Sequence, residues 1–97
     1  MGADAVWTGT WETNYGNVEL QQTNDAVTGV YALKQGRING RVLCDRLAGE
    51  WSEEPSYAPP DNAGEFEICL DLSGSSFKGK WWKLKPGSEH EWHGTKV

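Results

Sequence analysis

Two histidines stand three residues apart among carboxylates in EHEWH (89–93), and these residue types together can ligate a metal ion. In a β-strand, successive side chains alternate between the two faces. His90 and His93 would then point in opposite directions, so a single ion could not contact both rings. We therefore predict no metal site in this segment.

Catalytic patterns are lacking in the sequence. We find no nucleophile placed beside a base, no glycine-rich loop of the phosphate-binding kind and no pair of acids at a readable spacing. Glu53, Glu54 and Asp61 lie in the long segment 53–64, where we interpret them as solvated loop charges. The sequence thus predicts no catalytic residue and no cofactor. An enzyme of isomerase or cyclase type ranks third among the functional hypotheses.

Aromatic residues give the clearest indication of binding chemistry. Six tryptophans occur in 97 residues, and their rings can stack on a small apolar or aromatic ligand while a few polar groups orient it. The alternation of side chains along the predicted strands, together with the direction of each strand, selects the candidates. The predicted ligand-binding residues are Trp11, Asn14, Tyr31, Trp51, Trp81, Lys83 and Trp92.

A glycine-centred pattern, apolar-x-Gly-x-apolar, defines the elements that must position these residues. It occurs at WTGTW (7–11), VTGVY (27–31), INGRV (38–42), LAGEW (47–51), FKGKW (77–81) and, with lysine in the last place, WHGTK (92–96). Segments 17–22 and 65–72 alternate without glycine, and the second places Phe66, Ile68, Leu70 and Leu72 inward. No segment has a helical period. We predict eight short strands separated by turns.

The fold expected from these strands is a single all-β domain over 1–97. Inward glycines are typical of tightly curved, closed sheets, so we predict an eight-stranded antiparallel up-and-down barrel, with a β-sandwich as the alternative. The order of glycine-centred and plain strands is the same in both halves. This order suggests that the barrel is built from two four-stranded repeats.

The two ends of such a barrel would differ. Connections after odd-numbered strands are longer and share one mouth, whereas those after even-numbered strands are tight turns. Parity and direction place four of the six tryptophans on the loop-rich side of the glycines. The tryptophans could line a cup for a ligand or fill the barrel. Our first hypothesis is a small-molecule-binding barrel with its cup at the loop-rich mouth, and the second is a filled barrel that acts as a protein-interaction module.

The first strands resemble the avidin and streptavidin family. TGTWETNYGNVEL is similar to that family's first hairpin, and AVTGVY is similar to its third strand. The resemblance implies a ligand-binding barrel, with Tyr31 and loosely Asn14 as site candidates. Leu33 stands where the family has a hydroxyl residue, and EWHGTKV lacks the family's final Trp-Leu-Leu. We therefore expect a ligand other than biotin.

Charge and composition narrow the expected partners. The formal net charge of −5 disfavours nucleic acid and anionic membranes. Two cysteines and an N-terminus without a basic or apolar segment favour free thiols and a cytoplasmic location, and a signal peptide removed before residue 1 is left open. Trp82 and Leu84 have outward parity, which makes them the candidate contact of a homo-oligomer.

Overall fold

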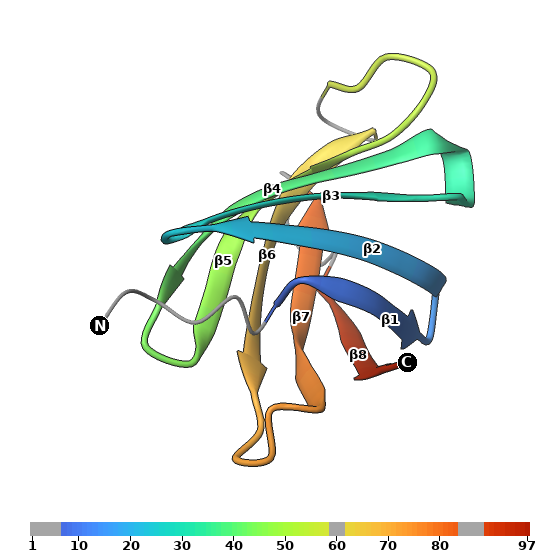
Figure 1. Cartoon of the computed structure of the whole chain (residues 1–97). Coiled ribbons are helices and arrows are strands. Elements are labelled where there is room, and N and C mark those ends of the chain that lie inside the picture. The colour runs from blue at the N-terminus through green and yellow to red at the C-terminus, as the bar shows by residue number, and fades with distance from the viewer. Residues whose placement is uncertain (1–6, 59–61, 84–88) are drawn as a thin grey trace.

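The chain forms a closed barrel of eight antiparallel strands, each paired with its neighbours in chain order (Figure 1). The structure is a computed structural model and describes residues 7–58, 62–83 and 89–97. The strands are β1 (Gly9–Thr13), β2 (Gly16–Thr23), β3 (Ala26–Tyr31), β4 (Gly36–Leu43), β5 (Arg46–Ser52), β6 (Ala63–Leu70), β7 (Ser76–Lys83) and β8 (His90–Lys96). A short 3-10 turn, Leu33–Gln35, joins β3 to β4. The predicted up-and-down barrel is confirmed, and closure through β1 and β8 excludes the sandwich.

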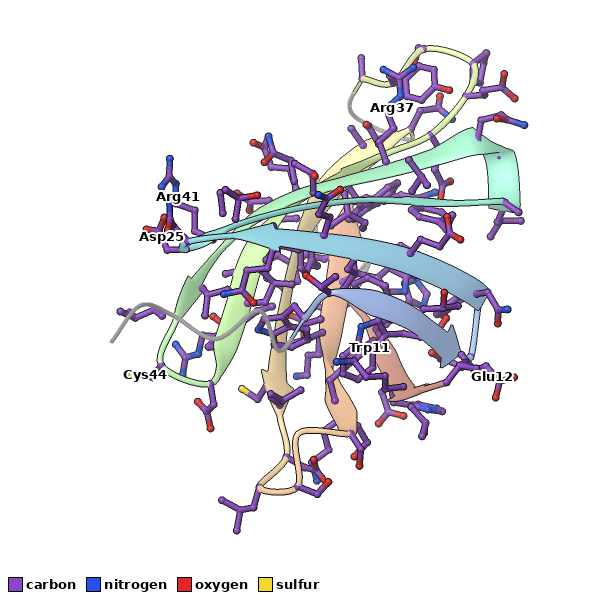
Figure 2. All side chains as sticks on the ribbon, viewed as in Figure 1. Trp11, Glu12, Asp25, Arg37, Arg41 and Cys44 are labelled. Carbon is purple, nitrogen blue, oxygen red and sulfur yellow. The ribbon has the colours of Figure 1, made fainter. Side chains whose placement is uncertain are left out.

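The barrel has two unlike ends. In Figure 1 the connections β1–β2, β3–β4 and β5–β6 lie toward the right and the top, while β2–β3, β4–β5 and β6–β7 lie toward the left and the bottom. We call the first the loop-rich mouth and the second the closed end. The closed-end turns are tight: Asn24, Cys44 and Gly74 adopt positive φ there. Arg41 pairs with Asp25 at this end, with 3.4 Å between Nη1 and Oδ1 (Figure 2).

The glycines lie beside large side chains of neighbouring strands rather than beside one another. Gly29 is opposite Leu20 and Ile38. Gly79 is opposite Ile68 and Trp92. Among the central glycines of the six motifs, Gly40 and Gly49 are directly paired. A Cβ at Gly49 would collide with the Asn39 carbonyl oxygen. Glycine therefore permits close strand approach, and bulky neighbours fill the volume it leaves.

The half of the barrel toward the closed end is filled by side chains. Trp7, Trp11 and Phe77 pack with ring centroids 5.3 to 6.0 Å apart and are almost inaccessible to solvent. Aliphatic residues complete this layer, and the fully buried ones are Val27, Leu47 and Ile68. The Lys96 ammonium lies 5.2 Å from the centre of the Trp11 ring. A packed core of this kind supplies the stability of a small domain.

Two strands have a boundary that differs from the prediction. β1 begins at Gly9, so Trp7 precedes the strand, although its side chain is fully buried. Leu72 was expected inward, but β6 ends at Leu70 and Leu72 is fully exposed. The Asp71 carboxylate stops the strand by accepting hydrogen bonds from the Gly74 backbone and the Ser73 hydroxyl. The bond from Ser73, followed by hydrogen bonds from Ser76 and Ser75, lowers the pKa of Asp71.

Two further sequence expectations concern thiols and repeats. Cys44 is exposed, Cys69 is partly buried, and both are free thiols. The assembly of the barrel from two four-stranded repeats stays a prediction. No helix in the described ranges is long and apolar enough to cross a membrane.

Candidate ligand cavity at the loop-rich mouth

A cavity of about 210 Å³ opens at the loop-rich mouth. Its floor consists of side chains that are at most 6% exposed, namely Val18, Ile38, Trp51 and Trp92. Its walls and rim come from connections and strand ends, namely Tyr15, Tyr31, Leu33, Lys34, Glu53, Trp81 and Lys83. The barrel is thus filled toward the closed end and hollow toward the mouth.

Aromatic rings arranged around Trp81 form one wall of the cavity. The centroids of Trp51 and Trp81 are 5.3 Å apart with an interplanar angle of 83°, and Tyr15 meets Trp81 at 5.6 Å and 78°. His90 stacks on Trp81 at 4.5 Å and 25°. Such edge-to-face contacts suit the quadrupoles of aromatic rings. They hold Trp81 in place although it is only partly buried.

The tryptophans of the cavity floor are held in place by contacts with residues of other strands. The Trp51 indole Nε1 donates a hydrogen bond to the Trp82 carbonyl oxygen at 3.2 Å, which ties β5 to β7 across β6. The Trp92 ring packs edge-on against Phe66 and Phe77, with centroids 5.5 and 5.4 Å apart. Because these indoles are fixed before any ligand arrives, binding need not cost much side-chain entropy.

A hydrogen-bonded pair, Tyr31 and Glu53, supplies the best-defined polar group of the cavity. The Tyr31 hydroxyl donates to Glu53 Oε2 at 2.7 Å. Burial raises the pKa of Tyr31, and the hydrogen bond and negative charge of Glu53 raise it further. The phenol is therefore neutral at physiological pH and holds a carboxylate at the cavity wall.

Spacing in the sequence explains why two charged residues reach the cavity. Glu53 follows Trp51 by two residues and Lys83 follows Trp81 by two, so each shares the inward face of its tryptophan. Both strands run toward the mouth. Lys83 was predicted as a site residue and does line the cavity. Glu53 was interpreted as a solvated loop charge, and that interpretation is wrong: it is partly buried and bonded to Tyr31.

Five of the seven predicted ligand-binding residues line the cavity, and two do not. Tyr31, Trp51, Trp81, Lys83 and Trp92 come together there. Trp11 lies in the filled layer, where its Nε1 donates to the Trp7 carbonyl oxygen at 2.9 Å. Asn14 closes the seam between β1 and β8: its Nδ2 donates to the Glu91 carbonyl oxygen, and its Oδ1 accepts from the His93 backbone, both at 3.1 Å.

The position of Trp11 follows from the tilt of the strands. Trp11 faces Val18 across β1–β2, and Val18 faces Tyr31 across β2–β3. Val18 and Tyr31 line the cavity, whereas Trp11 contacts the closed-end rings of Trp7 and Phe77. In a barrel, strands are tilted by roughly 35–45° relative to the barrel axis. Residues paired across successive strands therefore lie at different positions along that axis. The alternation of side chains and the direction of a strand predict whether a residue points inward, but they do not predict its position along the barrel axis.

Trp82, a candidate oligomer contact, forms a hydrogen bond within its own chain. Trp82 is partly buried on the outer surface, and its Nε1 donates to Glu65 Oε1 at 3.2 Å. Leu84, the second predicted contact residue, lies outside the described residues. Self-association through this face stays a prediction.

Within the described ranges, no three His, Cys, Asp or Glu residues lie close enough together to hold a metal ion. Comparison with protein-family models, with curated proteins and with solved structures found no match. Of the resemblance to avidin and streptavidin, the eight-stranded antiparallel closed barrel is confirmed, and membership of that family stays a prediction.

Proposed function

We propose that this protein binds a small organic molecule in the cavity at its loop-rich mouth. The observation that carries the proposal is the division of one interior into a filled layer and a hollow one. A barrel of eight strands is just narrow enough to be filled by its own side chains. Here the residues at the mouth leave about 210 Å³ between anchored aromatic rings.

The size of the cavity sets the size of the ligand. An engineered cavity of about 150 Å³ accepts benzene, whereas drug-sized ligands occupy roughly 300–1,000 Å³. A volume of about 210 Å³ lies between these. We expect a ligand with one ring or an equally compact branched group. Trp51, Trp81 and Trp92 supply apolar surface, and Tyr31, Glu53 and Lys83 supply the polar groups that orient it.

Titration with benzyl alcohol tests this function. Binding should quench tryptophan fluorescence, because three of the six indoles line the cavity. Replacing Trp81 with alanine should abolish the response. The matched control is Trp82→Ala, which removes the neighbouring indole from the outer face and should leave binding intact. Equal loss in both variants, or no quench in wild type across a panel of single-ring compounds, would contradict the proposal.

Biotin provides a specificity control. Asn14, the amide nearest to the avidin pattern, is committed to the β1–β8 seam, and Leu33 at the rim offers no hydroxyl. The cavity therefore lacks the ring of polar groups that the family uses. We expect biotin to bind far more weakly than single-ring ligands, and tight biotin binding would refute this assignment of the polar groups.

A further inference from the structure

We propose that the cavity prefers a cationic head group, namely a methylated or otherwise substituted ammonium. This inference rests on the proposed function and adds the sign of the ligand's charge. Two features carry it: a carboxylate fixed at the cavity wall, and indole and phenol rings set at right angles around the same space.

Glu53 is the first of these features. Its Oε2 accepts the Tyr31 hydroxyl at 2.7 Å, and its backbone N–H donates to the Asn62 carbonyl oxygen at 2.7 Å. Both the side chain and the backbone are therefore held. A carboxylate can accept more hydrogen bonds than the single one that Tyr31 donates. A cation in the cavity would face a negative charge that is partly shielded from water, where the attraction is stronger than at an open surface.

The aromatic wall is the second feature. Quaternary ammonium groups are attracted by the negative faces of indole and phenol rings, and proteins use cages of such rings to bind them. Trp51 and Tyr15 each stand nearly perpendicular to Trp81, so ring surfaces meet the cavity from more than one direction. A compact trimethylammonium group could contact these rings and Glu53 at the same time.

Two lysines at the same mouth act against a cation and make the inference testable. Lys34 is exposed and Lys83 is partly buried. A lysine ammonium sits on a long flexible stem and can keep its charge in water. The Glu53 carboxylate is held at the cavity wall by its hydrogen bond from Tyr31. We expect the fixed charge to determine which ligand is preferred and the lysines to weaken the preference.

Three ligands with the same branched head separate charge from shape. They are choline, its neutral counterpart 3,3-dimethylbutan-1-ol, and the anion 3,3-dimethylbutanoate. Calorimetric titration of the full chain should rank choline first, by about tenfold over the alcohol, and the anion last. If the alcohol or the anion binds best, the cation preference is wrong while the ligand-binding function stands. If none of the three binds and benzyl alcohol also fails, both are wrong.

Two variants should shift the affinity for choline in opposite directions. Glu53→Gln keeps an acceptor for Tyr31 and removes the charge, so it should weaken choline binding about tenfold and weaken binding of the alcohol much less. Lys83→Met keeps the apolar stem and should strengthen choline. Glu50→Gln is the matched control, since it makes the same change on the exposed face of β5. The reverse pattern, or equal effects of Glu53→Gln and Glu50→Gln, would overturn the proposal.

A trimethylammonium group can belong to a free small molecule or to a modified lysine side chain. Comparing choline with a short peptide that contains trimethyllysine distinguishes these sources. Binding of either one with loss in Glu53→Gln supports the cation site. Binding that is indifferent to Glu53→Gln contradicts it.

Discussion

The Tyr31 hydroxyl on β3 donates a hydrogen bond of 2.7 Å to Glu53, just beyond the end of β5, across the mouth of the barrel. The two residues are 22 positions apart in the sequence, and β4 lies between their strands. This bond turns a loop carboxylate into a fixed part of the cavity. It also has a consequence for the stability of the barrel at high pH.

We expect stability to decline as the pH rises above about 10 because of Tyr31. The pKa of Tyr31 is raised in the folded protein, whereas an unfolded tyrosine titrates near 10. Above that pH the unfolded state releases a proton that the folded state keeps, so unfolding becomes more favourable. Below pH 10 the contribution is fully present. Tyr31→Phe should flatten this decline in urea denaturation measured from pH 9 to pH 11.

Tyrosinate absorbance checks the same assignment directly. At pH 11, folded wild type and folded Tyr31→Phe should give equal absorbance, since Tyr31 remains protonated. In denaturant, wild type should exceed the variant by one tyrosinate. A difference that is already present in the folded proteins would show that Tyr31 titrates normally.

Gly40→Val should destabilise the barrel by about 1–3 kcal/mol through overpacking. A Cβ at Gly40 would lie 2.8 Å from the Ala48 carbonyl oxygen and 3.2 Å from Phe66 Cζ. Asn39→Val is the control, because it adds the same side chain to the exposed face of the same strand. We expect that change to stay within about 0.5 kcal/mol in urea denaturation. Equal midpoints for the two variants would disprove the close approach at Gly40.

Trp11→Phe should cost more stability than Trp7→Phe, by about 1 kcal/mol. Both indoles are fully buried in the filled layer. Trp11 Nε1 has a partner in the Trp7 carbonyl oxygen, whereas Trp7 Nε1 is buried and has no hydrogen-bond partner among the described residues. Phenylalanine at position 7 removes an unsatisfied donor, and at position 11 it removes a bond. Thermal unfolding that ranks the variants in the opposite order would refute this difference.

Much of the fold could be predicted from alternation and turn residues alone. The period of two gives the inward face of each strand, and six glycine-centred segments with two plain alternating segments give the number of strands. The length of the connections separates the loop-rich mouth from the closed end. These local signals are strong because a one-residue register slip would expose the entire core face.

The site could be predicted only in part, for two physical reasons. The height of a residue along the barrel depends on strand tilt, a global property, and this moved Trp11 out of the cavity. Glu53 was missed because its loop composition indicated solvent exposure. Its place two residues after Trp51 was the available signal, since parity continues past the end of β5 as far as Glu53. The contribution of Asn14 to the seam has no sequence signature of its own.

Asn14→Ala should weaken closure between β1 and β8. The amide makes two hydrogen bonds to the β8 backbone next to a seam of only three paired positions. Their loss should cost about 1–2 kcal/mol and should speed amide exchange in β1 and β8 more than in β4 and β5. Asn17→Ala, an exposed change at the start of β2, provides the control. Uniform exchange rates across the barrel in Asn14→Ala would contradict this role.

The central claim is that one half of the interior is filled and the other half receives a ligand. The six indole N–H resonances in a ¹⁵N-edited NMR spectrum test it most directly, once each is assigned by Trp→Phe substitution. Added benzyl alcohol should shift the resonances of Trp51, Trp81 and Trp92, which line the cavity. Those of Trp7 and Trp11, in the filled layer, and of Trp82, outside, should stay in place. Shifts spread over all six resonances, or confined to Trp82, would contradict a ligand site at the loop-rich mouth.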